Sequence, residues 1–455
     1  MLPFAVVVYE PTAFTLENWV CPSRFLFRNT KLFSHMPLQY RLPFIGHLKT
    51  PLIVSMMTLL TLSAASLHAQ ESLIISLDSI EDRIQKQNPD LAAARKRIAE
   101  AKGRLDQSGR LSNPVFGIEA SQDPSFDEHA LSVSIAQKFP ITNRLALARA
   151  ISQTSLQAAE AEVLDVERRL SATAKQLVIQ ILANQQHRQL LKKQQTLAHQ
   201  FATHLSDSAD KGEGSVLDAG QAKLEAAQFT NKLRQLSARS ASFHGQLKPL
   251  LGMGTTELLS VTGNLSGFHL PSSSAHTNQR PDLQAAKLHA TAATQSAALE
   301  RAKSRDDIEL TFTAGVERTE DVPVGYDSEK HFGIGFRIPL PLWNKNKGAI
   351  DAADARSERK HLEASALDHK IQHQASTAYT EMSEWAKIGR EISLNLLPMA
   401  RKQAELAVKA YHEGQGDLQA TLRAREQVLD LSSAELKALR DFHLAKTRYQ
   451  AALNQ

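Results

Sequence analysis

Two histidines, His369 and His373, have the spacing of a pair that can hold a metal ion, because positions i and i+4 lie on one face of a helix. No carboxylate or third ligand is evident beside them, so a solvated or packed helix face is the favoured interpretation. The sequence also contains no glycine-rich phosphate loop after a strand and no HExxH motif. We therefore predict that the protein is not an enzyme and that it has no metal site and no cofactor.

The amino-acid composition argues against several other kinds of functional site. The 455 residues are 42% hydrophobic and 22% charged, which is typical of a folded chain rather than a disordered one. Cys21 is the only cysteine, so the chain can form neither a disulfide framework nor a four-thiolate metal site. The net charge of +5 arises from interspersed residues of both signs, and we predict no nucleic-acid partner.

Two glycine-marked breaks, KGEG at 211–214 and EGQG at 413–416, interrupt long helical stretches. Glycine permits the positive φ that lets a helix end and the chain fold back. We expect each break to be the tip of a helical hairpin. The glycines could be turn formers alone, or they could also mark a surface for a partner.

Most of the sequence after residue 72 is helix-forming. No proline or glycine occurs from Arg144 to Asp210, so we expect one helix there, roughly 100 Å long at about 1.5 Å per residue. Apolar residues recur every seven positions and predict a coiled-coil seam: Leu156, Val163, Leu170 and Leu177, and later Leu422, Leu429 and Leu436.

Four segments alternate apolar and polar residues instead: 115–121, 131–139, 308–317 and 332–338. Glu309 and Glu317 lie on the polar face of the third segment, and Arg337 on that of the fourth. Strands of about nine to eleven residues with one apolar face fit a transmembrane β-barrel. An antiparallel sheet packed on a soluble core would alternate in the same way.

The start of the chain has the features of a targeting segment. An apolar run at 52–62 follows Arg41 and Lys49 and leads into small residues that end at Ala69. This order is typical of a secretory signal peptide, and a retained membrane anchor is the alternative. The signal, together with the lack of further strands for a soluble sheet domain, favours the barrel.

The rest of the chain after the signal segment consists of two copies of one sequence pattern. Residues 88–94 (NPDLAAA) match residues 280–286 (RPDLQAA), and each copy continues as a helix, a strand pair and a long helical hairpin. The predicted organisation is an upstream extension at 1–35, a signal peptide at 36–69, a first repeat at 70–270 (strand pair 113–140, tip 211–216) and a second repeat at 271–455 (strand pair 307–339, tip 413–418).

Closure of the sheet constrains the assembly. Four strands from one chain would leave two unpaired edges in lipid, where each unpaired backbone group costs several kcal/mol. Known membrane barrels have about eight strands or more, so two copies would have to supply eight strands or three copies twelve. The expected fold is mainly α-helical with transmembrane β-structure, and long helices project into the compartment beneath.

These features together resemble the TolC family of outer-membrane efflux proteins, over residues 72–455. The resemblance rests on the two Pro-Asp-Leu helix starts, the strand pairs that end at Pro140 and Pro339, and the two glycine-marked tips. It implies a homotrimer with a twelve-stranded β-barrel in the outer membrane and an α-helical tunnel in the periplasm. Residues 338–348 (IPLPLWNKNKG) resemble the cobalt–zinc–cadmium branch, which partners resistance–nodulation–division (RND) pumps that export heavy-metal cations.

The resemblance implies a passive channel, surrounded by outer-membrane lipid and served by a periplasmic adaptor protein and an inner-membrane RND pump. A conduit for drug efflux or type I protein secretion is the alternative within the family. A structural periplasmic coiled-coil protein is the alternative outside it, although such a stalk needs no embedded strands.

Candidate residues also follow from the resemblance. In the family the hairpin tips contact the adaptor, and the matching positions are Gly212, Glu213, Gly214, Ser215, Val216, Gly414, Gln415, Gly416, Asp417 and Leu418. Asp218 and Tyr411 fall where an acid and a tyrosine hold the resting entrance shut. Ala420 and Arg423 stand where the drug-efflux type places an aspartate ring, so the gate is expected to differ here. Glu309, Glu317 and Arg337 are candidates for the barrel lumen.

Overall fold

The computed structural model describes residues 73–124, 128–271, 280–321 and 323–454. All the described residues belong to one compact unit. The predicted upstream extension at 1–35 and signal peptide at 36–69 lie outside the described residues.

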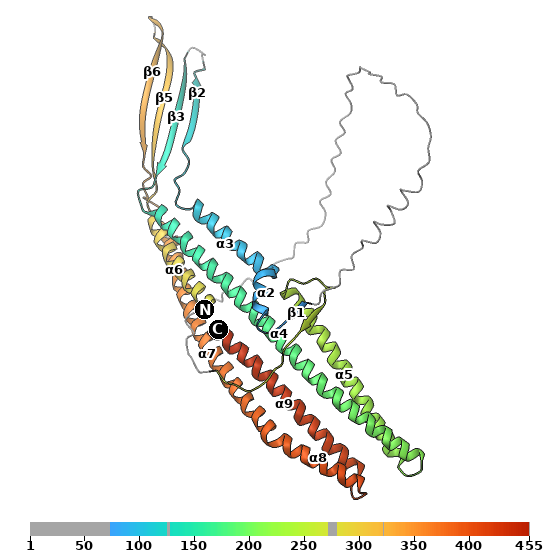
Figure 1. Cartoon of the computed structure of the whole chain (residues 1–455). Coiled ribbons are helices and arrows are strands. Elements are labelled where there is room, and N and C mark those ends of the chain that lie inside the picture. Colours follow the sequence, from blue (N-terminus) through green and yellow to red (C-terminus); the bar gives the residue numbers. More distant parts are fainter. Residues whose placement is uncertain (1–72, 125–127, 272–279, 322, 455) are drawn as a thin grey trace, which may run out of the picture. The chain divides into compact units, whose positions relative to one another are not determined.

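Each half of the described chain runs as helix, strand pair and long helical hairpin (Figure 1). The first half contains β1 (Leu73–Ile75), α2 (Ile80–Gln87), α3 (Pro89–Gln107), β2 (Val115–Gln122), β3 (His129–Phe139), α4 (Arg144–Asp210) and α5 (Val216–Leu250). The second contains β4 (Leu259–Val261), α6 (Pro281–Ala302), β5 (Ile308–Asp321), β6 (Gly325–Arg337), α7 (Lys347–Glu391), the π-helical turn η1 (Ile392–Leu396), α8 (Leu397–His412) and α9 (Leu418–Leu453). The bounds of α4 are those that its proline-free and glycine-free sequence predicted.

Proline occupies the first position of the helix that opens each repeat, where its missing N–H costs nothing. These residues are Pro89 in α3 and Pro281 in α6. The Asn88 side chain caps α3 by accepting a hydrogen bond of 2.8 Å from the Leu91 amide. The second repeat has Arg280 at the matching position, and this side chain makes a different connection.

An ion-pair network around Arg280 joins the two repeats. The Arg280 guanidinium lies 2.5 Å from Asp282, and Arg168 of α4 lies 3.8 Å from the same carboxylate. Arg168 also binds Asp165 and donates a hydrogen bond of 3.0 Å to the Ala451 carbonyl in α9. Burial alone would raise the pKa of Asp282, but the hydrogen bond and charge of Arg280, with the charge of Arg168, hold that pKa below its ordinary value. The second Pro-Asp-Leu start therefore ties α6 to α4 and α9.

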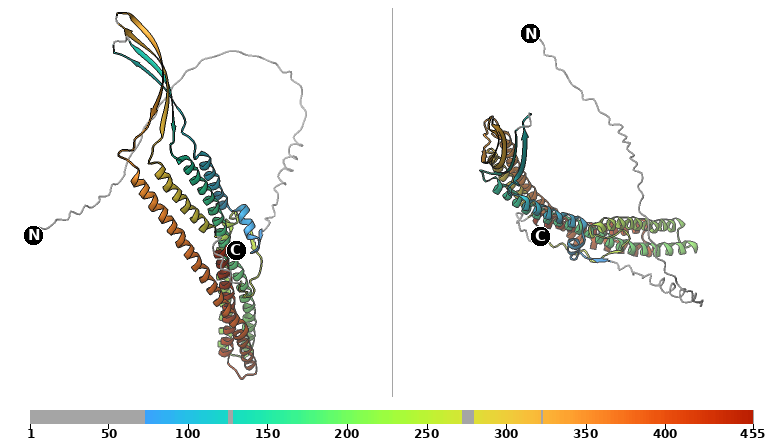
Figure 2. Two further views of the ribbon diagram at one scale, coloured as in Figure 1. Left: turned by 90° about the vertical axis from the view of Figure 1, so that its left-hand side faces the viewer. Right: turned by 90° about the horizontal axis from the view of Figure 1, so that it is seen from above.

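Strands β2, β3, β5 and β6 form one antiparallel sheet in that order, which leaves β2 and β6 at its edges (Figure 2). All four strands predicted from alternation are present. β5 and β6 extend further than the alternation indicated, because the backbone ladder continues through polar residues as far as the pair Asp321–Gly325. The described chain has an open four-stranded sheet and not a closed barrel.

A second, parallel sheet was not predicted. It pairs β1 with β4, and Leu73 lies beside Leu259. Two strands of three residues each, far apart in the sequence, have no local pattern that would reveal them.

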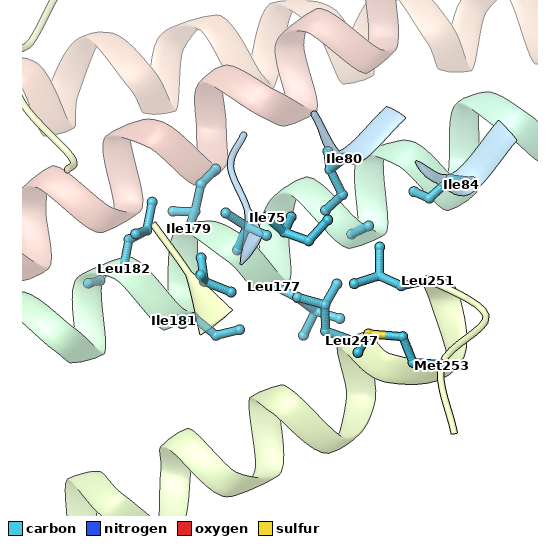
Figure 3. Packing of buried hydrophobic residues seen from close by; sticks show 14 of the residues in the cluster. Ile75, Ile80, Ile84, Leu177, Ile179, Ile181, Leu182, Leu247, Leu251 and Met253 are labelled. Carbon is cyan, nitrogen blue, oxygen red and sulfur yellow. The ribbon is translucent and has the colours of Figure 1, made fainter. Parts of the chain in front are cut away.

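The largest apolar core lies where the middle of α4 meets α2, β1, β4 and the end of α5 (Figure 3). Ile179, Ile181 and Leu182 of α4 are all at most 2% exposed, because this part of the helix is covered on several sides. Ile80 of α2 and Leu247 of α5 pack into the same cluster.

The positions of the predicted coiled-coil seam are buried or half-buried, which is consistent with that prediction. Val163 and Leu177 are 6% and 7% exposed, and Leu429 of α9 is 5% exposed. Among the helices that the structure describes, none combines the length and the apolar character needed to cross a membrane.

Candidate functional site

The two hairpin tips share one backbone design. Gly212 after α4 has a φ of 76° and Gly414 after α8 has a φ of 71°, in the left-handed region that glycine adopts without strain. In each tip the next amide donates to the carbonyl five residues earlier, over 2.8 Å for Glu213 and 2.9 Å for Gln415. These bonds end the incoming helix and turn the chain back.

A side chain caps the outgoing helix of each tip. Ser215 Oγ accepts a hydrogen bond of 3.3 Å from the Asp218 amide, and the Asp417 carboxylate accepts one of 2.9 Å from the Ala420 amide. The predicted docking residues from 212 to 216 and from 414 to 417 are all exposed. Whether an adaptor binds them stays a prediction.

Leu418 differs from the other predicted docking residues. It is only 4% exposed and belongs to a small apolar cluster between the two hairpins. Phe201 and Leu205 of α4 and Ala222 of α5 belong to the same cluster. Leu418 is therefore not part of an exposed docking surface in this structure, because it packs the second hairpin against the first.

The predicted gate residues come from different hairpins, and the structure brings them near each other. Tyr411 packs edge-on against Phe201, with ring centroids 6.1 Å apart. Burial raises the pKa of Tyr411, and the nearby charge of Asp218 raises this pKa further. The phenol therefore keeps its proton next to an acid, as a polar link between hairpins requires. Its role in gating stays a prediction.

A hollow of about 490 Å³ lies between the same two hairpins. Arg425 of α9 lies 4.5 Å from the centre of the Phe201 ring, and Glu225 of α5 lines the hollow with it. Burial raises the pKa of Glu225 while the charge of Arg425 opposes that shift. Burial likewise lowers the pKa of Arg425. The hollow between the hairpins is therefore lined by charged side chains that are partly buried.

The strand register places the polar positions of the large sheet on one face. Lys138 of β3, Glu309 of β5 and Arg337 of β6 form one row across it. The three predicted lumen residues share this face, and Arg337 lies 2.5 Å from Glu309. Glu317 lies further along β5, directly opposite Glu329. Lys138 was missed as a candidate, although the alternation at 131–139 would have identified it, whereas Glu329 lies outside the predicted segment 332–338.

The other face of the sheet is apolar and exposed. Phe116, Ile334, Phe336 and Phe332 are 63%, 65%, 71% and 85% exposed. An uncovered apolar face of this kind is typical of a surface that meets lipid or another protein. The apolar character continues past β6 to Trp343, which is 93% exposed.

The histidine pair noted in the sequence lies on the surface of α7. His369 and His373 are both exposed on α7. Within the described ranges, no group of three or more His, Cys, Asp or Glu side chains is placed to hold a metal ion. Both histidines therefore lie on a solvent-exposed helix face.

Residues 273–455 match the family described as outer membrane efflux protein. This match covers the second of the two repeats and confirms the resemblance identified from the sequence. The description of this family agrees with the outer-membrane localisation that the resemblance implies.

Similarities to individual proteins agree with this family match. The chain is 22% identical over 377 residues to the cobalt-zinc-cadmium resistance protein CzcC of Cupriavidus metallidurans, covering 81% of this chain and 84% of that protein. The crystal structure of CusC matches with a TM-score of 0.71 at 16% identity, over 83% of this chain and 91% of that one. The outer membrane channel CmeC of Campylobacter jejuni matches with a TM-score of 0.69 at 16% identity, over 83% and 85% of the two chains. These structures show that the fold is that of a TolC-like outer-membrane channel.

Proposed function

We propose that this protein is the outer-membrane channel of a tripartite RND efflux system and that it conducts heavy-metal cations passively from the periplasm to the exterior. Three copies form the channel. An inner-membrane RND pump supplies the energy, and a periplasmic adaptor docks at the hairpin tips. The metal ions are cargo, and the pump selects them.

The large sheet is the observation that carries the channel proposal. It has one polar face, one exposed apolar face and two free edges, β2 and β6. In lipid, each unpaired backbone group of those edges would cost several kcal/mol. Pairing β6 of one copy with β2 of the next removes every edge, and three copies supply twelve strands, within the range of known barrels. The polar face then lines the bore while the apolar face contacts lipid.

The substrate class rests on two similarities. One is to a relative named for cobalt, zinc and cadmium resistance, over 81% of the chain. The other is the segment 338–348, which links β6 to α7 and resembles the cobalt–zinc–cadmium branch. A periplasmic stalk would have no use for the exposed apolar sheet face, which favours the channel over that alternative.

Deletion of the gene tests the substrate class. The deleted strain should grow less well in zinc, cobalt, cadmium or copper, and a plasmid copy should restore growth. Unchanged tolerance to all four ions would remove the metal assignment.

The mass of the detergent-extracted protein tests the trimeric channel separately. We expect the mass of three copies. A monomer would contradict a barrel that several copies share.

A further inference from the structure

A charged hollow of about 460 Å³ lies where the sheet meets the helices. We call it the basic junction, and its charged lining residues are Lys138, Arg144, Lys303, Arg305, Asp306, Asp307, Glu309 and Arg337. Five of these side chains are basic and three are acidic, so each chain carries an excess of two positive charges there.

Two of the three acids, Glu309 and Asp307, are more covered than the bases they pair with, whereas Asp306 is exposed. Glu309 lies 2.5 Å from Arg337 and 3.9 Å from Lys138. The Glu309 side chain is 15% exposed, whereas those of Arg337 and Lys138 are 78% and 60% exposed. Asp307 is likewise paired with Arg144 and is 13% exposed against 34% for the arginine. The surface offered to solvent is therefore more positive than the composition alone indicates.

The position of this surface follows from the strand register. Lys138, Glu309 and Arg337 occupy one row across β3, β5 and β6, on the polar face. Glu317 and Glu329 form an acidic row on the same face, eight residues further along β5. At about 3.3 Å per residue the two rows are roughly 26 Å apart. Because the Debye length is about 10 Å at 0.1 M salt, the charges of one row are screened at the other row, and each row affects only the ions close to it.

We propose that the basic junction is an ion-selectivity element that concentrates small inorganic anions, such as chloride, at this level of the bore. The inference rests on the proposed trimeric channel, in which three junctions face one bore. Their positive potential raises the local anion concentration and repels cations. The accumulated anions screen this potential and so lower the electrostatic barrier that metal cations meet at this level of the bore.

Reversal potentials of the purified trimer in planar bilayers, under a potassium chloride gradient, test the proposal. Arg337→Gln should lower the anion-to-cation permeability ratio about twofold near 0.1 M salt, where the Debye length of about 10 Å screens the distant acidic row. Glu309→Gln removes the covered acid and should raise the ratio. Arg337→Lys keeps the charge and should retain the wild-type ratio.

Lys330→Gln is the matched control. Lys330 lies on β6 opposite Val316, on the apolar face, so loss of its charge should leave the ratio unchanged. Pores whose selectivity is the same in wild type, Arg337→Gln and Glu309→Gln would overturn the proposal while the channel function stands. A wild-type protein that forms no pores would overturn the channel function itself.

Discussion

Val216 and Leu418 occupy equivalent positions in the two hairpin tips, yet Val216 is 77% exposed and Leu418 is 4% exposed. Each is the first residue of its outgoing helix, after the capping residue Ser215 or Asp417. The duplicated tips therefore have different tasks. The first presents an apolar side chain to solvent, while the second uses its own to hold the hairpins together.

Substitution of these two residues should separate docking from stability. Leu418→Ala should destabilise the folded protein by about 2–5 kcal/mol, as for other large-to-small changes in a core. Val216→Ser should leave the melting temperature unchanged and weaken metal tolerance by disturbing the docking surface. Thermal melting in detergent and growth in zinc provide the two measurements. Equal melting temperatures for both variants would contradict the assigned roles.

The tip glycines should not tolerate a β-branched residue. Gly212→Val or Gly414→Val places such a side chain at positive φ, at a cost of about 1–2 kcal/mol, and should distort the tip. We expect trimers that assemble but no longer export. Gly220→Val is the matched control, because Gly220 lies inside α5 with no atom within 4 Å of an added Cβ. Normal export by the Gly212→Val trimer would count against a role of that tip in docking.

Tyr411→Phe tests the predicted gate. The change removes the hydroxyl near Asp218 but keeps the ring that packs against Phe201. If the hydroxyl helps to close the resting channel, the variant should conduct more than wild type in bilayers without an adaptor. Tyr379→Phe is a control, since Tyr379 packs against Tyr449 in another cluster. Equal conductance in wild type and Tyr411→Phe would exclude the hydroxyl from the gate.

His443 should make the protein less stable in acid. Burial, assisted by the charge of Lys446 and opposed by a hydrogen bond with the Ser266 backbone, lowers its pKa from 6.5 to about 4. Because the folded pKa lies below the unfolded one, the stabilisation is complete above pH 6.5 and is lost as the pH falls towards 4. His443→Gln should flatten this part of the melting profile, whereas His369→Gln, at an exposed position, should not. If the melting temperature of His443→Gln depended on pH as that of the wild type does, the role assigned to His443 would be refuted.

Trp343 should contact lipid. It is 93% exposed and follows the apolar face of β6, where barrels carry aromatic girdles at the membrane interface. With the other two tryptophans of the sequence, Trp19 and Trp385, replaced by phenylalanine, its fluorescence in vesicles should be quenched by lipids brominated near the headgroup. Fluorescence that brominated lipid leaves unchanged would place Trp343 away from the membrane.

Local sequence determined most of the architecture. The absence of proline and glycine predicted α4 from Arg144 to Asp210, and alternation predicted the four strands of the large sheet. Glycines predicted both tips, where Gly212 and Gly414 have positive φ. Such features depend on the backbone preferences of neighbouring residues, so a short window of sequence contains the information.

Tertiary structure decided the environment of individual side chains. Only the packing of two hairpins shows that Leu418 is buried while Val216 is not. Only the pairing of β5 with its two neighbours shows that Arg337 and Lys138 cover Glu309. The β1–β4 pair likewise joins segments far apart in the chain. Burial and charge pairing depend on partners from distant parts of the sequence, and a local pattern contains no information about which partners will meet.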